Sequence, residues 1–169
     1  MSTYYQSPMN ASTLIEQLNL QAHPEGGYYQ ETYRCKDSLK VTENAERSIS
    51  TAIYFLLKDQ DKSHFHRIKS DELWFFHLGQ SLEILLLENG TLRTITLGSN
   101  LLVGDTLQAV VPANTWFASR LKDGKGFGLV SCTVAPGFDF QDFELATKSS
   151  LLAEYPHLSE VIQEMTLND

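Results

Sequence analysis

The chain has 169 residues, of which 42% are hydrophobic and 20% are charged. This length and composition predict one globular domain over residues 1–169 and exclude a disordered chain. Acidic residues outnumber basic ones by 21 to 13 without a basic cluster, which argues against nucleic acid as a partner. The first ten residues lack the features of a signal peptide, and no apolar run is long enough to span a bilayer. We therefore expect a cytoplasmic protein without membrane contact, whose Cys35 and Cys132 are reduced thiols.

The predicted secondary structure is almost entirely β, with helices only near the two ends. Thr13 and Glu16 form a capping-box pattern that predicts a short helix over 13–19, and the sequence HPEGG at 23–27 predicts a turn. Apolar spacing predicts helical structure again over 150–166. Between them, runs rich in aromatic and branched residues predict a β-barrel or sandwich with a core of about 28–145. The predicted strands cover 28–34, 48–57, 73–78, 82–87, 92–97, 107–111, 116–121 and 127–134.

Two histidines and a glutamate stand out in residues 63–79, SHFHRIKSDELWFFHLG. His64 and His66 are two residues apart, so on an extended strand their side chains point to the same face, and Glu72 can join them from the next strand. Imidazole and carboxylate groups are ligands for a divalent metal, and the same groups suit proton transfer. Both interpretations stay open here: a metal site of His64, His66 and Glu72, or a metal-free site in which His66 and Glu72 are catalytic.

These motifs resemble the signatures of a known superfamily. The arrangement of His64, His66, Glu72 and Gly79 resembles the first signature of the cupins, and the stretch from Gly104 to Phe117 resembles the second. Longer stretches are similar to a narrower cupin family, DUF985 or Cupin 5. These stretches are HPEGGYYQETYR (23–34), SISTAIYFLL (48–57), KSDELWFF (69–76), VVPANTW (110–116), APGFDFQDFEL (135–145) and LLAEYPHL (151–158). The resemblance implies a double-stranded β-helix, a jelly-roll barrel that is usually a homodimer, with a predicted sugar-epimerase activity.

Two departures from the cupin pattern bear on the metal. Five residues separate His66 from Glu72, where the pattern has three or four, and the extra residues shift the side-chain alternation unless a bulge near 69–71 absorbs them. Phe117 occupies the position of the histidine that is the fourth metal ligand in the family, and phenylalanine cannot coordinate a metal. A metal-free pocket is therefore favoured, with a divalent metal as the alternative.

Aromatic and polar residues around these positions predict a pocket for a small molecule. Alternation places Trp74 on the same strand face as Glu72, and it places Glu31 with Tyr33 on the first strand. An aromatic wall with a few polar groups is typical of a small-molecule site. The residues expected to contact the ligand are Glu31, Tyr33, Tyr54, Trp74 and Phe117.

Three functions are compatible with such a pocket. In the first, an epimerase or isomerase acts on a carbohydrate or nucleotide sugar. His66 then removes a proton, Glu72 or Asp71 orients the imidazole, and Tyr33 or Tyr54 returns a proton on the opposite face. In the second, the protein is a metal-dependent enzyme, either dioxygenase-like or isomerase-like. In the third, a non-catalytic module binds a metabolite or nucleotide in the barrel.

Overall fold

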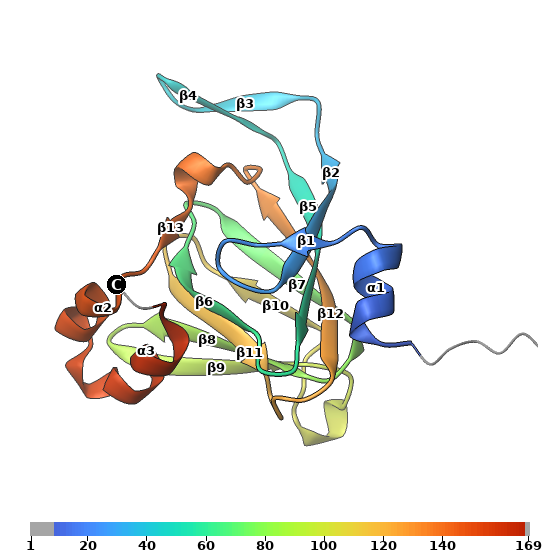
Figure 1. The fold of residues 1–169 in the computed structure, drawn as a ribbon. Helices are drawn as coiled ribbons and strands as arrows, with labels where there is room; N and C mark the ends of the chain where they lie inside the picture. The colour runs from blue at the N-terminus through green and yellow to red at the C-terminus, as the bar shows by residue number, and fades with distance from the viewer. Residues whose placement is uncertain (1–8, 168–169) are drawn as a thin grey trace, which may run out of the picture.

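Two antiparallel sheets face each other and form a barrel in the computed structural model, which describes residues 9–167 (Figure 1). Every pairing between its named strands is antiparallel. In order across the six-stranded sheet lie β1 (Gln21–Ala22), β2 (Tyr28–Arg34), β5 (Thr51–Lys58), β12 (Phe127–Ala135), β7 (Asp71–Gly79) and β10 (Gln108–Val111). In order across the five-stranded sheet lie β13 (Glu144–Leu145), β6 (Lys62–Arg67), β11 (Trp116–Leu121), β8 (Leu82–Glu88) and β9 (Thr91–Leu97). The predicted all-β barrel is confirmed.

The barrel core forms because alternate side chains of both sheets point inward. Its largest buried members are Phe55, Trp74, Phe117 and three residues of β8, Leu82, Ile84 and Leu86. The remaining members are Leu57, Leu97, Ala109, Val111, Leu121, Val130 and Cys132. β8 reads LEILLLE, without alternation, because its other face is buried as well.

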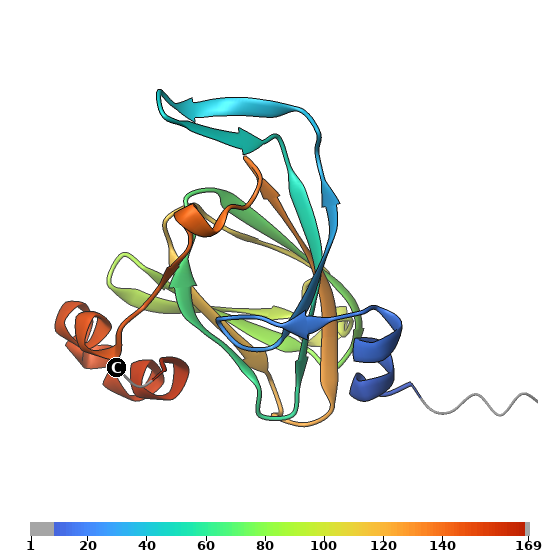
Figure 2. The same ribbon diagram turned by 45° about the horizontal axis from the view of Figure 1, so that its top comes forward.

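Short helices cover the outer faces of the sheets (Figures 1 and 2). Leu14 of α1 (Ala11–Gln17) packs on Leu56 and Leu129 of the six-stranded sheet. On the five-stranded sheet, α2 (Lys148–Glu154) and α3 (Ser159–Met165), joined by the 3₁₀ helix η3 (Pro156–Leu158), bury the outward face of β8. The first helix begins two residues before its predicted start because the side chain of Asn10, and not that of Thr13, caps it by accepting from the Thr13 N–H.

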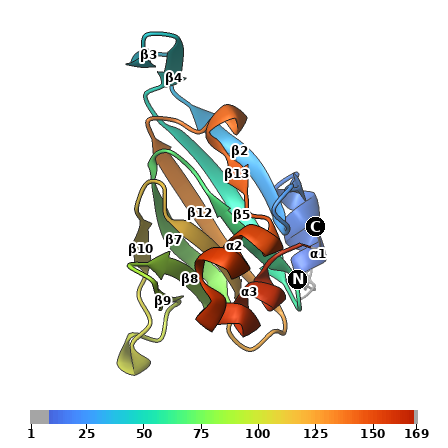
Figure 3. The same cartoon turned by 90° about the vertical axis from the view of Figure 1, so that its left-hand side faces the viewer.

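A hairpin of β3 (Ser38–Thr42) and β4 (Ala45–Ser48) projects beyond the barrel (Figure 3). Its polar sequence gives no alternation of buried and exposed residues, since every residue of β3 is exposed, and it was absent from the predicted strands. Two further 3₁₀ turns, η1 (Leu101–Val103) and η2 (Phe140–Asp142), lie in loops. Within residues 9–167, no helix has the length and apolar character that crossing a membrane requires.

Candidate active site

A cavity of about 310 Å³ opens between the two sheets. It combines buried ionisable side chains with a set of aromatic rings. The strands contribute Gln21, Tyr29, Gln30, Glu31, Arg34, Thr51, Ile53, His66, Glu72, Cys132 and Val134, and the neighbouring segments contribute His23, Glu25, Ile68, Phe138, Asp139, Phe140 and Phe143. A cleft of this size that combines apolar and polar side chains has the character of a small-molecule site.

Glu25 reaches the cavity because the turn at 23–27 lies directly against β6. The carbonyl oxygen of Glu25 accepts from the backbone N–H of His64 at 2.8 Å, and the Nδ1 of the same histidine lies 2.7 Å from it. Gly26 allows this close approach: its φ is +109°, and a side chain there would collide with the carbonyl of Lys62. The two contacts turn the Glu25 side chain toward the interior, where it is 6% exposed.

The Glu25 carboxylate holds a buried ion pair with His66. One oxygen accepts from the Ser63 hydroxyl at 2.8 Å, and the other lies 3.0 Å from His66 Nε2. The Nδ1 of His66 lies 2.8 Å from the His64 carbonyl, which can only accept, so Nδ1 carries a hydrogen. A hydrogen on Nε2 is then needed to face the carboxylate. His66 is therefore an imidazolium that donates in two directions.

The pKa values of this pair move apart. Burial alone would lower the pKa of His66, but the charge and hydrogen bond of Glu25 raise it above its ordinary value. Burial alone would raise the pKa of Glu25, but the charge and hydrogen bond of His66 lower it. His23 differs, because burial lowers its pKa and its Nδ1 accepts from the Glu25 backbone N–H at 3.3 Å. His23 is therefore neutral, and its Nδ1 at 3.4 Å from the Glu25 carboxylate forms no ion pair.

Glu72, on β7, lines the same cavity. Burial raises its pKa to about 7, and the charge of Glu25 adds to this rise. His66, the Cys132 thiol and the Trp74 indole lower it in part. The Trp74 N–H makes no well-formed hydrogen bond within residues 9–167, so it acts on Glu72 by proximity. Burial keeps the pKa of Cys132 well above its ordinary value, with a further rise from the two carboxyl groups. At neutral pH Glu72 thus exchanges its proton readily, whereas Cys132 stays a thiol.

Aromatic rings form one wall of the cavity. The His23 ring meets Tyr29 edge-on at 4.6 Å between centroids and stacks on Phe140 at 6.2 Å. Phe138 meets Phe140 edge-on at 5.0 Å, and Phe143 lies 5.4 Å from the His66 ring. The rings of His23 and Tyr29 come from the turn before β2 and from β2 itself, and those of Phe138, Phe140 and Phe143 come from the segment that follows β12, so the wall joins two distant parts of the chain.

Comparison with known proteins agrees with this architecture. The sequence pattern described as Cupin superfamily (DUF985) matches residues 12–146. The chain belongs to this family. This DUF985 chain is 32% identical over 149 residues to the uncharacterized protein YML079W of Saccharomyces cerevisiae, covering 80% of this chain and 74% of that one.

Solved structures give the same result. Protein SO0799 from Shewanella oneidensis is similar with a TM-score of 0.89 and 40% identity, over 95% of this chain and 99% of that one. A cupin 2 conserved barrel domain protein from Rhodopseudomonas palustris shares the fold alone, with a TM-score of 0.53 and 17% identity over 86% of this chain and 84% of that one. The predicted cupin barrel is confirmed.

The structure brings some of the predicted ligand-binding residues to the cavity. Glu31 lines it, as do both predicted catalytic residues, His66 and Glu72. Trp74 and Phe117 do point inward, but they belong to the packed core and do not line the cavity. The Phe117 ring lies under the site, 4.1 Å from the His66 ring. Its role in the structure is to support the imidazole.

Tyr33 and Tyr54 lie outside the cavity. A bulge at Thr32 breaks the alternation of β2, so Glu31 faces the interior while Tyr33 is 53% exposed. Tyr54 falls between inward-facing residues of β5 and so points outward, where its ring meets that of His77 at 5.9 Å. The proton-returning role expected for either tyrosine therefore has no geometric basis in this structure. Asp71 is likewise directed elsewhere, because it accepts from the Ala113 N–H at 2.8 Å.

The predicted metal ligands do not converge. β6 has one residue more than β11 between the pairs His66–Phe117 and Ser63–Ser119, and this irregularity separates His64 from the cavity face. The His64 ring contacts the Glu25 carbonyl instead, and both ring nitrogens of His66 are engaged. Among residues 9–167, no group of three or more His, Cys, Asp or Glu side chains is arranged to hold a metal ion. The residues present do not fit the expected site.

A chelation experiment checks this conclusion. We expect EDTA, and equimolar zinc or ferrous iron added separately, to leave the melting temperature of protein purified without a metal-affinity column unchanged, because no ligand set gains from the ion. Differential scanning fluorimetry gives the melting temperature, and elemental analysis gives the metal content. A stoichiometric metal whose removal lowers the melting temperature would restore the site of His64, His66 and Glu72.

Sequence reasoning missed several residues of the site. They are His23, Glu25, Ser63, Cys132, Phe138, Phe140 and Phe143. Glu25 stands in the HPEGG turn, whose two glycines indicate close backbone packing as well as a change of direction. That signal could have identified a buried turn. The aromatic spacing of GFDFQDF at 137–143 was the corresponding signal for the cavity wall.

Proposed function

We propose that the cavity is an acid–base site for a small polar metabolite with a carbonyl group, and that the reaction is an isomerisation or epimerisation. One observation carries this proposal: Glu25 and Glu72 line the same buried cavity, and their pKa values move in opposite directions. Such divergence of paired carboxyl groups is typical of sites that assign different protonation states to each group.

The geometry exchanges the roles that the sequence predicts. His66 already carries a proton on each ring nitrogen, so it cannot act as the base in this state. Glu72, with a pKa of about 7, is the group able to accept a proton at neutral pH. In the proposed reaction, Glu72 removes a proton from the carbon next to the ligand carbonyl and returns it to the former carbonyl carbon. The carbon that loses this proton carries a hydroxyl group, whose own proton moves to the carbonyl oxygen, so the hydroxyl and carbonyl groups change places.

The His66–Glu25 pair has an electrostatic role in this reaction. Proton removal leaves negative charge on the ligand oxygen, and the positive charge of His66 attracts it through space, because both N–H groups of the imidazolium are already engaged within the protein. Glu25 keeps His66 protonated throughout. A shift with one base is favoured over an epimerisation with two, because Tyr33 and Tyr54 do not line the cavity.

Hydrogen exchange in D₂O tests the proposal. Wild-type protein is expected to introduce deuterium next to the carbonyl of at least one compound in a panel of aldoses, ketoses and 2-hydroxy aldehydes, as followed by proton NMR. Glu72→Gln is expected to slow the exchange by about 10²–10⁴-fold, the usual contribution of a general base. Glu88→Gln is the matched control, since Glu88 pairs with Arg93 away from the cavity.

Two outcomes would count against it. Exchange by Glu72→Gln at the wild-type rate would remove Glu72 as the base. Tight binding without exchange by any compound would favour the second candidate function, a non-catalytic binding module, which the aromatic wall of the cavity also supports.

A further inference from the structure

Carboxyl groups outnumber positively charged side chains around the cavity. Among the described lining residues, the carboxyl groups are those of Glu25, Glu31, Glu72 and Asp139, and no lysine is present. Arg34 is the one arginine in this set, and His66 supplies the other positive charge. Binding a phosphate requires hydrogen-bond donors on positively charged side chains, preferably an arginine guanidinium whose N–H groups have no other partner. Phosphate binding in this cavity therefore depends on whether the guanidinium of Arg34 has N–H donors that are not bonded within the protein.

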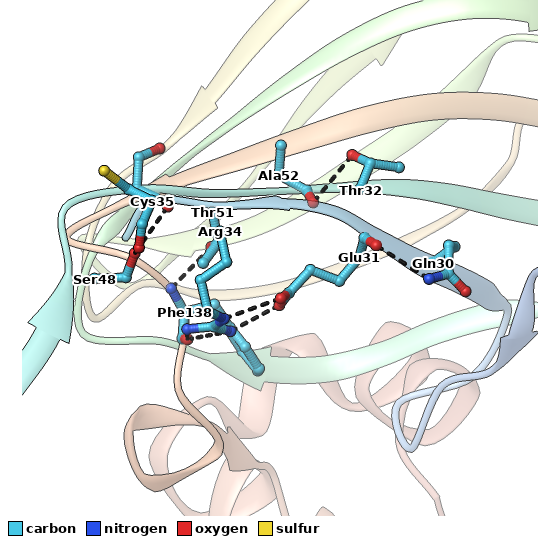
Figure 4. Close-up of polar contacts among 10 residues, drawn as sticks. Gln30, Glu31, Thr32, Arg34, Cys35, Ser48, Thr51, Ala52 and Phe138 are labelled. Atoms are coloured by element: carbon cyan, nitrogen blue, oxygen red, sulfur yellow. Dashed lines mark hydrogen bonds and ion pairs between the residues drawn. The ribbon is translucent and has the colours of Figure 1, made fainter. Parts of the chain in front are cut away.

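The guanidinium of Arg34 already donates hydrogen bonds to other residues of the chain (Figure 4). Its Nε and Nη2 donate to the two carboxylate oxygens of Glu31 at 2.9 and 2.7 Å. Its Nη1 and Nη2 also donate to the carbonyl of Phe138, both at 3.1 Å. The two N–H groups that would bind a phosphate in a bidentate manner are thus bonded to Glu31. Through Phe138, the same guanidinium also fixes the aromatic segment that follows β12. The Phe138 N–H in turn donates to Thr51 at 2.9 Å.

Both ring nitrogens of His66 likewise have partners within the protein. Its Nε2 is turned to Glu25 and its Nδ1 to the His64 carbonyl, so neither N–H remains for an anion. Among the described residues, the other polar groups of the cavity are carboxyl groups, such as Glu72 and Asp139, and neutral side chains, such as Gln21 and Tyr29, and aromatic rings line the same cavity. Acceptors suit the hydroxyl groups of a ligand, and aromatic faces suit the C–H face of a ring.

We infer that the cavity takes an uncharged, hydroxylated ring compound and excludes its phosphorylated counterparts. This inference rests on the proposed function for the location of the site and adds the charge of the ligand. It separates free carbohydrates from nucleotide sugars, which the sequence analysis left together, and it also excludes sugar phosphates.

Binding measurements on matched pairs test the inference. Isothermal titration calorimetry at low salt would compare free pentoses and hexoses with their phosphate esters, and inorganic phosphate would be titrated alone. We expect at least one free sugar to bind at least about tenfold more tightly than its ester, and inorganic phosphate not to bind. Equal or tighter binding of the esters would overturn the inference, and so would the absence of binding by every free sugar.

A charge-release variant makes the test sharper. Glu31→Gln removes one negative charge and the carboxylate that pairs with Arg34, while the hydrogen bonds from Arg34 to the Phe138 carbonyl remain. The ratio of ester affinity to sugar affinity is expected to rise at least about tenfold, whereas Glu88→Gln, with the same change of net charge, is expected to leave the ratio unchanged. An unchanged ratio in Glu31→Gln would contradict the role given to the Arg34 pair. Because binding is measured without turnover, a failed exchange assay with retained sugar preference would reject only the proposed reaction.

Discussion

Glu25→Gln is expected to lower the free energy of unfolding by about 3–5 kcal/mol near pH 5.5, as is typical when one partner of a buried ion pair is removed. The substitution leaves His66 buried at 3% exposure without its counter-charge. His66 then loses its proton, and its pKa falls below the ordinary value because burial is no longer opposed. Urea unfolding gives the free energy, and NMR titration of the imidazole gives the pKa.

The pH dependence of this loss follows from the two shifts. The lowered pKa of Glu25 stabilises the fold above the ordinary carboxyl value of 4.5, and this contribution disappears as pH falls through the folded-state pKa. The raised pKa of His66 stabilises it below 6.5, and this contribution disappears as pH rises through the folded-state pKa. The loss in Glu25→Gln should therefore be largest between these two values. Glu31→Gln, in a half-exposed pair, should cost less than about 1 kcal/mol, and equal losses in both variants would contradict a buried pair.

Glu72→Gln is expected to have the opposite effect on stability. A folded-state pKa of about 7, against an ordinary value of 4.5, means that the folded protein keeps a proton that the unfolded chain has released between these values. Wild-type stability therefore falls as pH rises from 4.5 to 7, by up to about 3 kcal/mol at 1.36 kcal/mol per unit. The glutamine variant should differ from the wild type by less than about 1 kcal/mol near pH 5 and be more stable by up to about 3 kcal/mol at pH 8.

Urea unfolding at the two pH values checks this expectation, with Glu88→Gln as the control without a pH-dependent gain. A variant equally destabilised at both pH values would show that Glu72 has an ordinary pKa. If Glu72→Gln is more stable at pH 8 and also slows the exchange of ligand hydrogen in D₂O, then the Glu72 carboxyl group both lowers the stability of the fold and acts as the base. Such opposition between stability and activity is typical of catalytic groups.

The barrel could be predicted from the sequence because its strands carry strong local signals. β2 and β11 begin and end where the branched and aromatic runs do, and β8 exceeds its predicted run by one residue. The location of His66 and Glu72 at one cavity was also predictable from their pattern. The projecting hairpin was not, because a strand exposed along its whole length has no periodicity to detect. The homodimer stays a prediction, which sedimentation can check.

The errors at the site have a common physical origin in irregular pairing. A simple alternation places Tyr33 with Glu31, and a simple i, i+2 rule places His64 with His66. One irregularity in β2 and one between β6 and β11 reverse both assignments. Glu25 was hidden for another reason: a carboxylate in a turn is normally exposed, and its burial depends on Ser63, which follows it by 38 residues.

The cavity is also built from residues that lie far apart in the chain. Its cavity is lined from Gln21 to Phe143, and β6 lies between β11 and β13 in its sheet. Because synthesis runs from the N-terminus, Glu25 is made before Ser63 and His66, its partners in the folded protein. The neighbours of β6 are complete only when residue 145 has been made. A nascent chain that stops before Phe143 therefore lacks part of the cavity lining, and the candidate site is complete only late in synthesis.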